Sequence, residues 1–199
     1  MNPALESNLA KEARTIYPVH PLIRGRWSAR SFSGEPIDDK DVKTLLEAAS
    51  WAFSSMNAQP WRYLYAHRSD TEAFQGLWSC LFPGNQPWAA NAAVLMVSVI
   101  NKQFDNGRPN HSALHDLGAA NATLMLQATS MGIYGHLLGG FDKQKTIEML
   151  GLDPEEVEPV VFIALGYLDG PERLQEPYRS RETTSRSRKA VEHFTERLL

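Results

Sequence analysis

The sequence predicts an α+β fold in which helices pack on a small, buried sheet. Two apolar runs, at residues 93–100 and 160–167, are typical of central strands that are buried on both faces. Apolar residues at helical spacing predict one helix before these strands, at 37–53, and one between them, at 114–131. A length of 199 residues is a little above the common domain size, so we expect a single domain over residues 1–199, and 43% hydrophobic residues suffice for its core.

The other elements follow from local signals along the chain. The helix at 37–53 starts at Asp38, which can cap it, and Ile37 and Val42 are spaced for a hydrophobic staple. Gly132 marks the end of the second long helix. The remaining segments are predicted as a surface helix at 3–16, a loop at 17–36, a turn at 54–60, a strand at 61–66, helices at 71–82 and 143–150, a Gly-rich stretch at 137–141, and a terminal helix near 189–198 after an irregular basic segment.

Composition argues against several classes of protein. A net charge of −3 is not typical of a dedicated nucleic-acid binder. The N-terminus lacks an apolar signal segment, and the longest apolar run, at 89–100, is too short to span a bilayer. The single cysteine, Cys80, lies in an apolar stretch and is expected to be a buried structural thiol. We therefore expect a cytoplasmic protein without a nucleic-acid or membrane partner.

Positive charge is concentrated in two islands of an otherwise acidic chain. Residues 24–30 carry three arginines and no acid, and residues 179–189 carry five basic residues beside a single acid, Glu182. Outside these windows, 12 basic residues stand against 22 acidic ones. Such islands can be solvated faces of the protein, but two of them also suit an anionic ligand.

Each island has the spacing of an oxyanion site. Arg26, Ser28 and Arg30 would share one face of an extended segment, because alternate residues of such a segment point the same way. Arg186 and Arg188 repeat this spacing near the other end of the chain. Arginine forks match phosphate oxygens, and a dianionic phosphate needs several charged partners. The two islands could thus share one anion; a solvated loop and a solvated tail are the alternative.

A third polar segment follows the first long helix. Hydroxyl and amide side chains gather there, and amides both donate and accept hydrogen bonds, which suits the edge of a heterocyclic ring. Ordinary helix-capping and turn chemistry is the alternative interpretation. The side chains concerned are those of Ser54, Ser55, Asn57 and Gln59.

Other common site motifs are missing from the sequence. His111 and His115 stand four residues apart, but no glutamate follows the first histidine and no third ligand is evident, so no metal site is expected. The glycines of residues 132–140 do not form the GxGxxG pattern of dinucleotide-binding folds. The nucleophile motif GxSxG and the phosphate-loop ending GK[ST] do not occur either.

Seven segments in order resemble the nitroreductase family of FMN-dependent oxidoreductases. The first two are Arg-Trp-Ser-Ala-Arg-Ser-Phe at 26–32 and Ser-Ser-Met-Asn-Ala-Gln-Pro-Trp-Arg at 54–62. The similarity covers nearly the whole chain. It continues through Asn85 to Trp88, Asp116-Leu117-Gly118, His136-Leu137-Leu138-Gly139-Gly140-Phe141-Asp142, Leu165-Gly166-Tyr167 and Arg186-Ser187-Arg188-Lys189.

This resemblance implies an intertwined α+β homodimer with a mostly antiparallel central sheet and one FMN at each of two subunit interfaces. It implies that a hydride passes from NADH or NADPH through the flavin to a small-molecule electron acceptor, such as a nitroaromatic or a quinone, in ping-pong order. No catalytic acid or base from the protein is implied. The alternatives are other flavin chemistry within the family, such as dehalogenation, azoline oxidation or flavin breakdown, and flavin binding without turnover.

The resemblance also implies which residues bind the cofactor. The first arginine island would contact the FMN phosphate and the pyrimidine edge, with Arg30 stabilising the reduced flavin, and the second island would close over the phosphate. The serine-rich turn would reach in from the partner subunit, and the glycine turn would place a backbone N–H near flavin N5. The full set is Arg26, Trp27, Ser28, Arg30, Ser54, Ser55, Asn57, Gln59, Leu138, Gly139, Gly140, Arg186 and Arg188.

Two positions depart from the family pattern. Phe53 stands where many members have a proline before the paired serines, so that loop could have a different shape. Gly139 stands where some members carry a larger or acidic residue, which would leave a roomier flavin face. Both departures bear on the choice of substrate more than on FMN binding.

Overall fold

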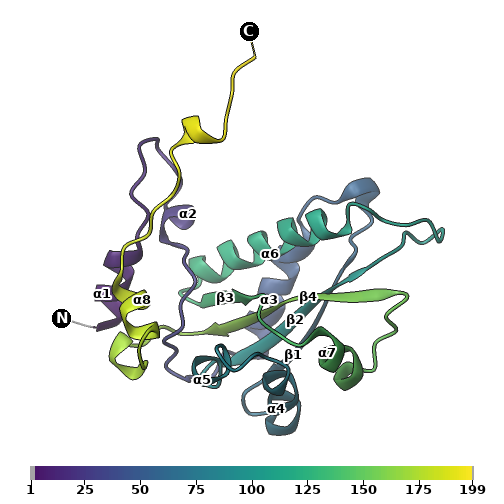
Figure 1. Ribbon diagram of the computed structural model, residues 1–199, viewed down its shortest axis with the longest axis horizontal. Coiled ribbons are helices and arrows are strands. Elements are labelled where there is room, and N and C mark those ends of the chain that lie inside the picture. Colours follow the sequence, from purple (N-terminus) through teal and green to yellow (C-terminus); the bar gives the residue numbers. More distant parts are fainter. Residues whose placement is uncertain (1–2, 199) are drawn as a thin grey trace.

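A four-stranded antiparallel sheet forms the centre of the computed structural model, which describes residues 3–198 (Figure 1). Its strands lie in the order β1-β2-β4-β3, where β1 is Trp61–His67, β2 is Val94–Asn101, β3 is Tyr134–Leu138 and β4 is Val157–Gly166. The predictions of β1, β2 and β4 are confirmed. β3 was not predicted: it overlaps the start of the Gly-rich stretch at 137–141 and forms because it pairs with β4 along its whole length.

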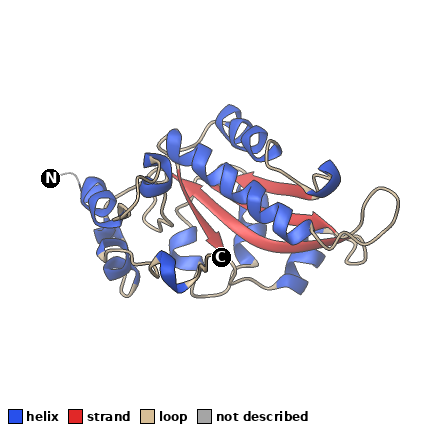
Figure 2. Ribbon diagram, turned by 90° about the horizontal axis from the view of Figure 1, so that it is seen from above, coloured by secondary structure: helices blue, strands red, loops and turns tan. Residues whose placement is uncertain are grey.

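Both faces of the sheet are covered by helices, as the apolar strand sequences predict. Val94 and Met96 of β2 pack in a cluster with residues of α3 (Asp39–Ser50) and α6 (Ala113–Ser130). The alternate residues of β2 pack on the other face, against α4 (Thr71–Ser79) and α5 (Gln86–Ala89). Seen from above, α6 runs along the sheet (Figure 2). The core therefore has two layers separated by the sheet, and β2 is buried in both.

The remaining elements connect these layers or lie at the chain ends. α7 packs against β4, and α1 packs against α8. No described helix is long and apolar enough to cross a membrane. The bounds are Pro3–Lys11 for α1, Pro21–Gly25 for α2, Lys143–Leu150 for α7 and Tyr178–Thr183 for α8, with short 3₁₀ turns at Ser55–Asn57, Pro171–Arg173 and Val191–His193.

Three helices end earlier than their sequence patterns predict. α1 ends at Lys11 rather than 16, and the Lys11 ammonium reaches across to carbonyl groups of the C-terminal segment. α3 ends at Ser50 rather than 53. α4 ends at Ser79 rather than 82, since the next residues pair with the segment after β3 through the Leu81–Phe141 bridge. Tertiary contacts thus override helical spacing at these ends.

The ends of the chain differ most from expectation. The loop predicted at 17–36 contains α2, and the basic segment predicted to be irregular contains α8. The helix predicted near 189–198 is wrong: this segment forms an extended arm with one 3₁₀ turn, which projects away from the sheet (Figure 1). Val191 and Phe194 are exposed on the arm, so it has no packed apolar face to stabilise a helix.

Candidate functional site

Residues 26–32 form an extended segment along the outer edge of β3. Ser28 bridges Gly135 in parallel, and Phe32 bridges Leu168. Side chains alternate along the first part of this segment, as the sequence predicts. Trp27 and Ala29 are buried in the core, whereas the opposite side carries Arg26, Ser28 and Arg30.

Arg186 fastens the C-terminal segment to the N-terminal one. Its Nη1 donates to the Arg26 carbonyl and its Nη2 to the Arg24 carbonyl, each at 2.7 Å. These carbonyls lie at the end of α2, where C=O groups lack partners within the helix and a cation is favourable. The two basic islands are therefore in direct contact. The Nε of Arg186 is buried without a hydrogen-bond partner among the described residues.

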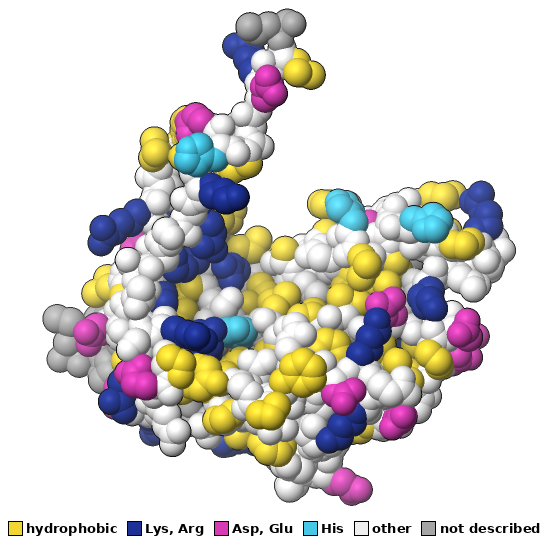
Figure 3. Space-filling view, viewed as in Figure 1, with side chains coloured by type: hydrophobic (Ala, Val, Ile, Leu, Met, Phe, Trp, Pro, Cys, Tyr) yellow, Lys and Arg dark blue, Asp and Glu magenta, His cyan; other side chains and the backbone are white. Residues whose placement is uncertain are grey.

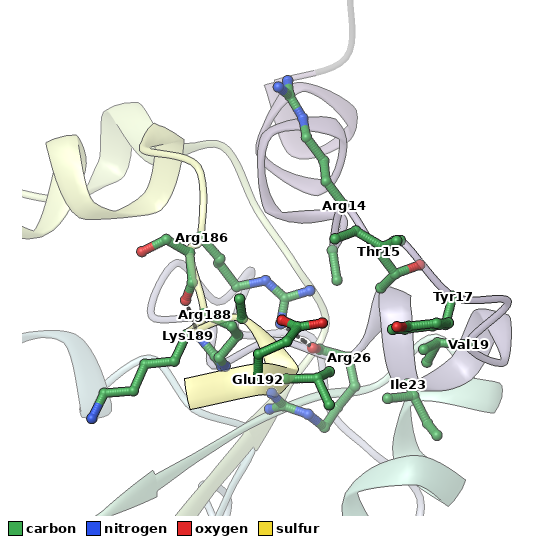
Figure 4. A pocket seen from close by; sticks show the side chains of 15 residues that line it. Arg14, Thr15, Tyr17, Val19, Ile23, Arg26, Arg186, Arg188, Lys189 and Glu192 are labelled. Atoms are coloured by element: carbon green, nitrogen blue, oxygen red, sulfur yellow. Dashed lines mark hydrogen bonds between the residues drawn. The ribbon is translucent and has the colours of Figure 1, made fainter. Parts of the chain in front are cut away.

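Three arginines from the two islands line one cavity of about 670 Å³ (Figure 4). Arg26, Arg186 and Arg188 form no ion pair with a carboxylate in the described part of the chain. Burial, and then the charge of Arg188, lowers the pKa of Arg26. Burial, and then the charges of Arg26 and Arg188, lowers the pKa of Arg186. An anion in this cavity would raise the pKa values of Arg26 and Arg186 again, because an opposite charge favours the protonated guanidinium.

The walls of this cavity come from both ends of the chain. The loop after α1 and the C-terminal arm form two sides, and α2 contributes a third. Viewed from the same direction as Figure 1, basic side chains gather on the inner side of the arm and hydrophobic ones on the floor beside it (Figure 3). Glu192 is the one acid among the lining residues, against four arginines and Lys189, so the cavity combines an apolar surface with an excess of positive charge.

Arg30 differs from the other arginines because it has its own carboxylate. Its Nη1 lies 3.6 Å from Glu182 Oε1, and its backbone N–H donates to Glu182 Oε2 at 3.3 Å. The guanidinium also lies over the Trp88 ring, 5.8 Å from its centroid. Burial raises the pKa of Glu182, while the N–H and the charge of Arg30 oppose that rise. Arg30 is thus partly neutralised within the protein.

Sequence reasoning missed His136, which lies on β3 beside Arg30. Its Nδ1 is 3.1 Å from the Ala29 carbonyl, and its ring packs against the Trp88 ring in a tilted arrangement with the centroids 4.7 Å apart. Burial, and then the charge of Arg30, lowers the pKa of His136 to about 4. Because a carbonyl can only accept, the neutral ring carries its proton on Nδ1 and leaves Nε2 as an acceptor. The motif His-Leu-Leu-Gly-Gly contained this histidine, but nothing in it indicated contact with Trp88 and the arginine segment.

The glycine turn after β3 is held by a side chain from another segment. The Gly140 carbonyl accepts hydrogen bonds from the Phe82 N–H at 3.0 Å and from Asn85 Nδ2 at 2.9 Å. A Cβ atom at Gly140 would lie 2.7 Å from Asn85 Nδ2, whereas one at Gly139 would meet nothing within 4 Å. Leu138 is buried, so its side chain belongs to the core and only its backbone can face a ligand.

The serine-rich turn lies at the opposite end of α6 from the arginines. The Ser55 N–H donates to Asp116 Oδ2 at 2.9 Å near the start of α6. Gly25, next to Arg26, lies beside Thr129 near the end of the same helix. Thirteen residues of helix, about 20 Å, separate these two anchors. Within one chain, the turn and the arginine cluster do not meet.

Two further sequence expectations concern histidine and cysteine. Among the described residues, no group of three or more His, Cys, Asp or Glu side chains is arranged to hold a metal ion. His115 instead lies beside Asp116, with 3.1 Å between Nδ1 and Oδ1. Cys80 is a buried free thiol in the core, as predicted.

The partly buried His136 predicts a pH dependence of stability. An unfolded histidine takes up a proton near pH 6.5, whereas folded His136 stays neutral down to about pH 4. The unfolded chain binds more protons in this window, so stability falls as the pH falls from 6.5 to 4, by at most about 1.4 kcal/mol per pH unit.

Urea unfolding of the wild type and His136→Asn at several pH values measures this effect. The asparagine amide can still donate to the Ala29 carbonyl but does not titrate, so its stability should fall less steeply. Equal slopes for the two proteins would show that His136 titrates normally.

Comparisons with known proteins place the chain in a family. The model of the nitroreductase family matches residues 23–79 and 81–167. A solved oxidoreductase containing FMN is 34% identical with a TM-score of 0.87, over 92% of this chain and 93% of its own. A Desulfovibrio desulfuricans protein solved in complex with FMN is 25% identical with a TM-score of 0.71, over 93% of this chain and 100% of its own.

A sequence relative extends the comparison. A protein of Archaeoglobus fulgidus, whose name proposes NADH dehydrogenase or NAD(P)H nitroreductase activity, is 28% identical over 152 residues. The alignment spans 73% of this chain and 83% of that protein. The family model covers most of the chain, including the first arginine island, the serine-rich turn and the glycine turn. The chain belongs to the nitroreductase family.

Proposed function

We propose that this protein is an NAD(P)H-dependent flavin oxidoreductase that binds FMN noncovalently and reduces small conjugated electrophiles such as nitroaromatics and quinones. One observation carries the proposal: Arg26, Arg186 and Arg188, from opposite ends of the chain, line one cavity and form no ion pair with a described carboxylate, Glu192 of the same cavity included. The FMN-containing relatives support the identity of the anion.

The residues of the cavity fit a phosphate group. Guanidinium groups form strong charge-assisted hydrogen bonds with phosphate oxygens. Arg186 already uses two N–H groups to hold the chain ends together, and its unpaired Nε remains. We infer that Arg26 and Arg188 are the main phosphate ligands, and that Arg186 both orients the first island and adds charge.

The flavin ring would lie along the edge of the sheet, between the arginine segment and the glycine turn. Ser28 is exposed on the same side as Arg26 and Arg30, and its hydroxyl can bond the pyrimidine edge. Gly139 is exposed and carries no side chain that would block a ring, while Asn85 fixes the neighbouring Gly140. The Trp27 and Leu138 side chains are buried, so we assign these two residues backbone contacts only.

A second copy of the chain would complete the site. The serine-rich turn cannot reach the arginines of its own chain, because about 20 Å of α6 separates the turn from the arginine cluster. The side chains concerned are those of Ser54, Ser55, Asn57 and Gln59. Around this turn, Trp51, Phe53 and Met56 expose 83%, 69% and 76% of their surfaces. Large exposed apolar side chains in a cluster are typical of a protein interface. We infer a homodimer in which each turn serves the partner's cofactor.

When bound, FMN would supply the redox chemistry: it takes a hydride from NADH or NADPH and gives it to an acceptor bound in turn at the same place. The protein's part is to bind and orient. Arg30, paired with Glu182, would place positive charge near the pyrimidine edge. The neutral His136 beside it adds an acceptor without adding charge. Gly139 leaves room for a flat acceptor over the ring.

Removing a phosphate ligand should weaken FMN binding. A lost charge-assisted hydrogen bond costs about 1.5–3 kcal/mol, so Arg26→Ala and Arg188→Ala should each raise the FMN Kd about ten- to a hundredfold. Arg14→Ala is the matched control, because Arg14 lines the same cavity but points away from the other arginines (Figure 4). Fluorescence titration of the apoprotein with FMN gives the three constants. Unchanged constants for Arg26→Ala and Arg188→Ala would place the phosphate elsewhere.

The function itself is tested by the visible spectrum of the purified protein. We expect a flavin spectrum that bleaches with NADH or NADPH and returns when a nitroaromatic or a quinone is added under anaerobic conditions. A flavin that neither nicotinamide reduces would favour a binding module without turnover. A reduced flavin that neither acceptor reoxidises would favour other flavin chemistry. A colourless protein that takes up no FMN would contradict the proposal.

A further inference from the structure

Asp116 is a buried carboxylate at the start of α6 that no part of the proposed chemistry uses. Only 2% of its surface is exposed. Its Oδ2 accepts the Ser55 N–H at 2.9 Å, and its Oδ1 lies 3.1 Å from His115 Nδ1. A carboxylate is rarely buried without a specific partner, because losing its hydration is costly. Here the buried partner is the backbone of the serine-rich turn.

The turn that Asp116 contacts has an unfavourable backbone conformation. Met56 and Asn57 both have φ of 54°, and Gln59 has φ of 45°. Asparagine tolerates this left-handed region, but Met56 and Gln59 are residue types that rarely adopt it unless surrounding contacts enforce it. Such backbone strain is concentrated at functional sites.

Most hydrogen bonds of the turn cannot place it relative to the rest of the protein. Asn57 and Ala58 donate to the Ser54 and Ser55 carbonyls, and the Gln59 N–H donates to Ser54 Oγ. These bonds are internal to the turn. Among the described hydrogen bonds of residues 54–59, the one to Asp116 joins the turn to a helix of the core.

We infer that Asp116 is a positioning residue for the cofactor site: its carboxylate holds the left-handed serine-rich turn on α6 in the shape that reaches the FMN of the partner subunit. This inference rests on the proposed function, because it takes FMN as the ligand and the homodimer as the assembly. Asp116 touches neither the cofactor nor the substrate. It acts through the Ser55 backbone, on a site about 20 Å from the arginines of its own chain.

Single variants separate positioning from folding. Asp116→Ala should raise the FMN Kd about tenfold, and Asp116→Asn, which keeps an acceptor oxygen, should recover most of the affinity. His115→Phe removes the other contact of the carboxylate but keeps a ring against Phe53, so it should leave the Kd unchanged.

A second pair of variants tests the same bond if Asp116→Ala fails to fold. Ser55→Pro removes the donor N–H, and Ser55→Ala removes only the hydroxyl. Ser54, at φ −147° and ψ 151°, is already in a conformation that a following proline accepts. Ser55→Pro should therefore bind FMN more weakly than Ser55→Ala. Equal constants would show that the bond to Asp116 does not position the turn.

A mixed dimer gives the decisive readout. One chain carries Arg26→Ala and the other Asp116→Ala, with different affinity tags so that the heterodimer can be purified. If Asp116 acts on the partner's site, one site combines both defects and the other has neither, so half of the sites bind FMN with the wild-type Kd. If every site is weakened, Asp116 acts within its own chain and the inference is overturned.

The controls distinguish this failure from failure of the proposed function. Wild-type protein that does not bind FMN would contradict the proposed function itself. Wild-type protein that binds FMN, together with a folded Asp116→Ala homodimer of unchanged Kd, would overturn only the role of Asp116.

Discussion

The meeting of the two chain ends is the contact on which the candidate site depends. The Arg186 guanidinium donates two hydrogen bonds to carbonyls at the end of α2, and it thereby joins segments that are about 160 residues apart in sequence. The Lys11 ammonium adds a second connection, to the Thr184 carbonyl at 2.6 Å. Three guanidinium groups are thereby held close together, although like charges repel. A bound anion would offset the repulsion between these guanidinium groups.

The sheet supplies a rigid edge for this cluster. Pairing with β3 and Leu168 fixes residues 26–32, and the same strand leads into the glycine turn. Charge is distributed unevenly along the edge. Arg30 is compensated by the buried Glu182, whereas the arginines toward the C-terminal arm are not. A phosphate dianion would therefore bind best at the end of this edge beside the C-terminal arm. A neutral ring would bind best at the other end, near the neutral His136.

Sequence patterns predicted what depends on neighbouring residues, and they missed what depends on distant ones. The buried strands and the alternation of Arg26, Ser28 and Arg30 follow from local periodicity. β3 was missed because its pairing with β4 outweighs its glycine. Glu182 looked like an isolated acid in a basic island, and its pairing with Arg30 spans 152 residues of sequence. The terminal helix was wrong because the arm has no core to pack on, which no local pattern reveals.

The central claim is that two copies of the chain build each FMN site, one with its arginines and the other with its serine-rich turn. Native mass spectrometry of the FMN-loaded protein across a dilution series tests this directly. We expect dimers that carry two FMN molecules and dissociated monomers that carry none. Monomers that retain FMN would contradict it, because one chain would then form the whole site.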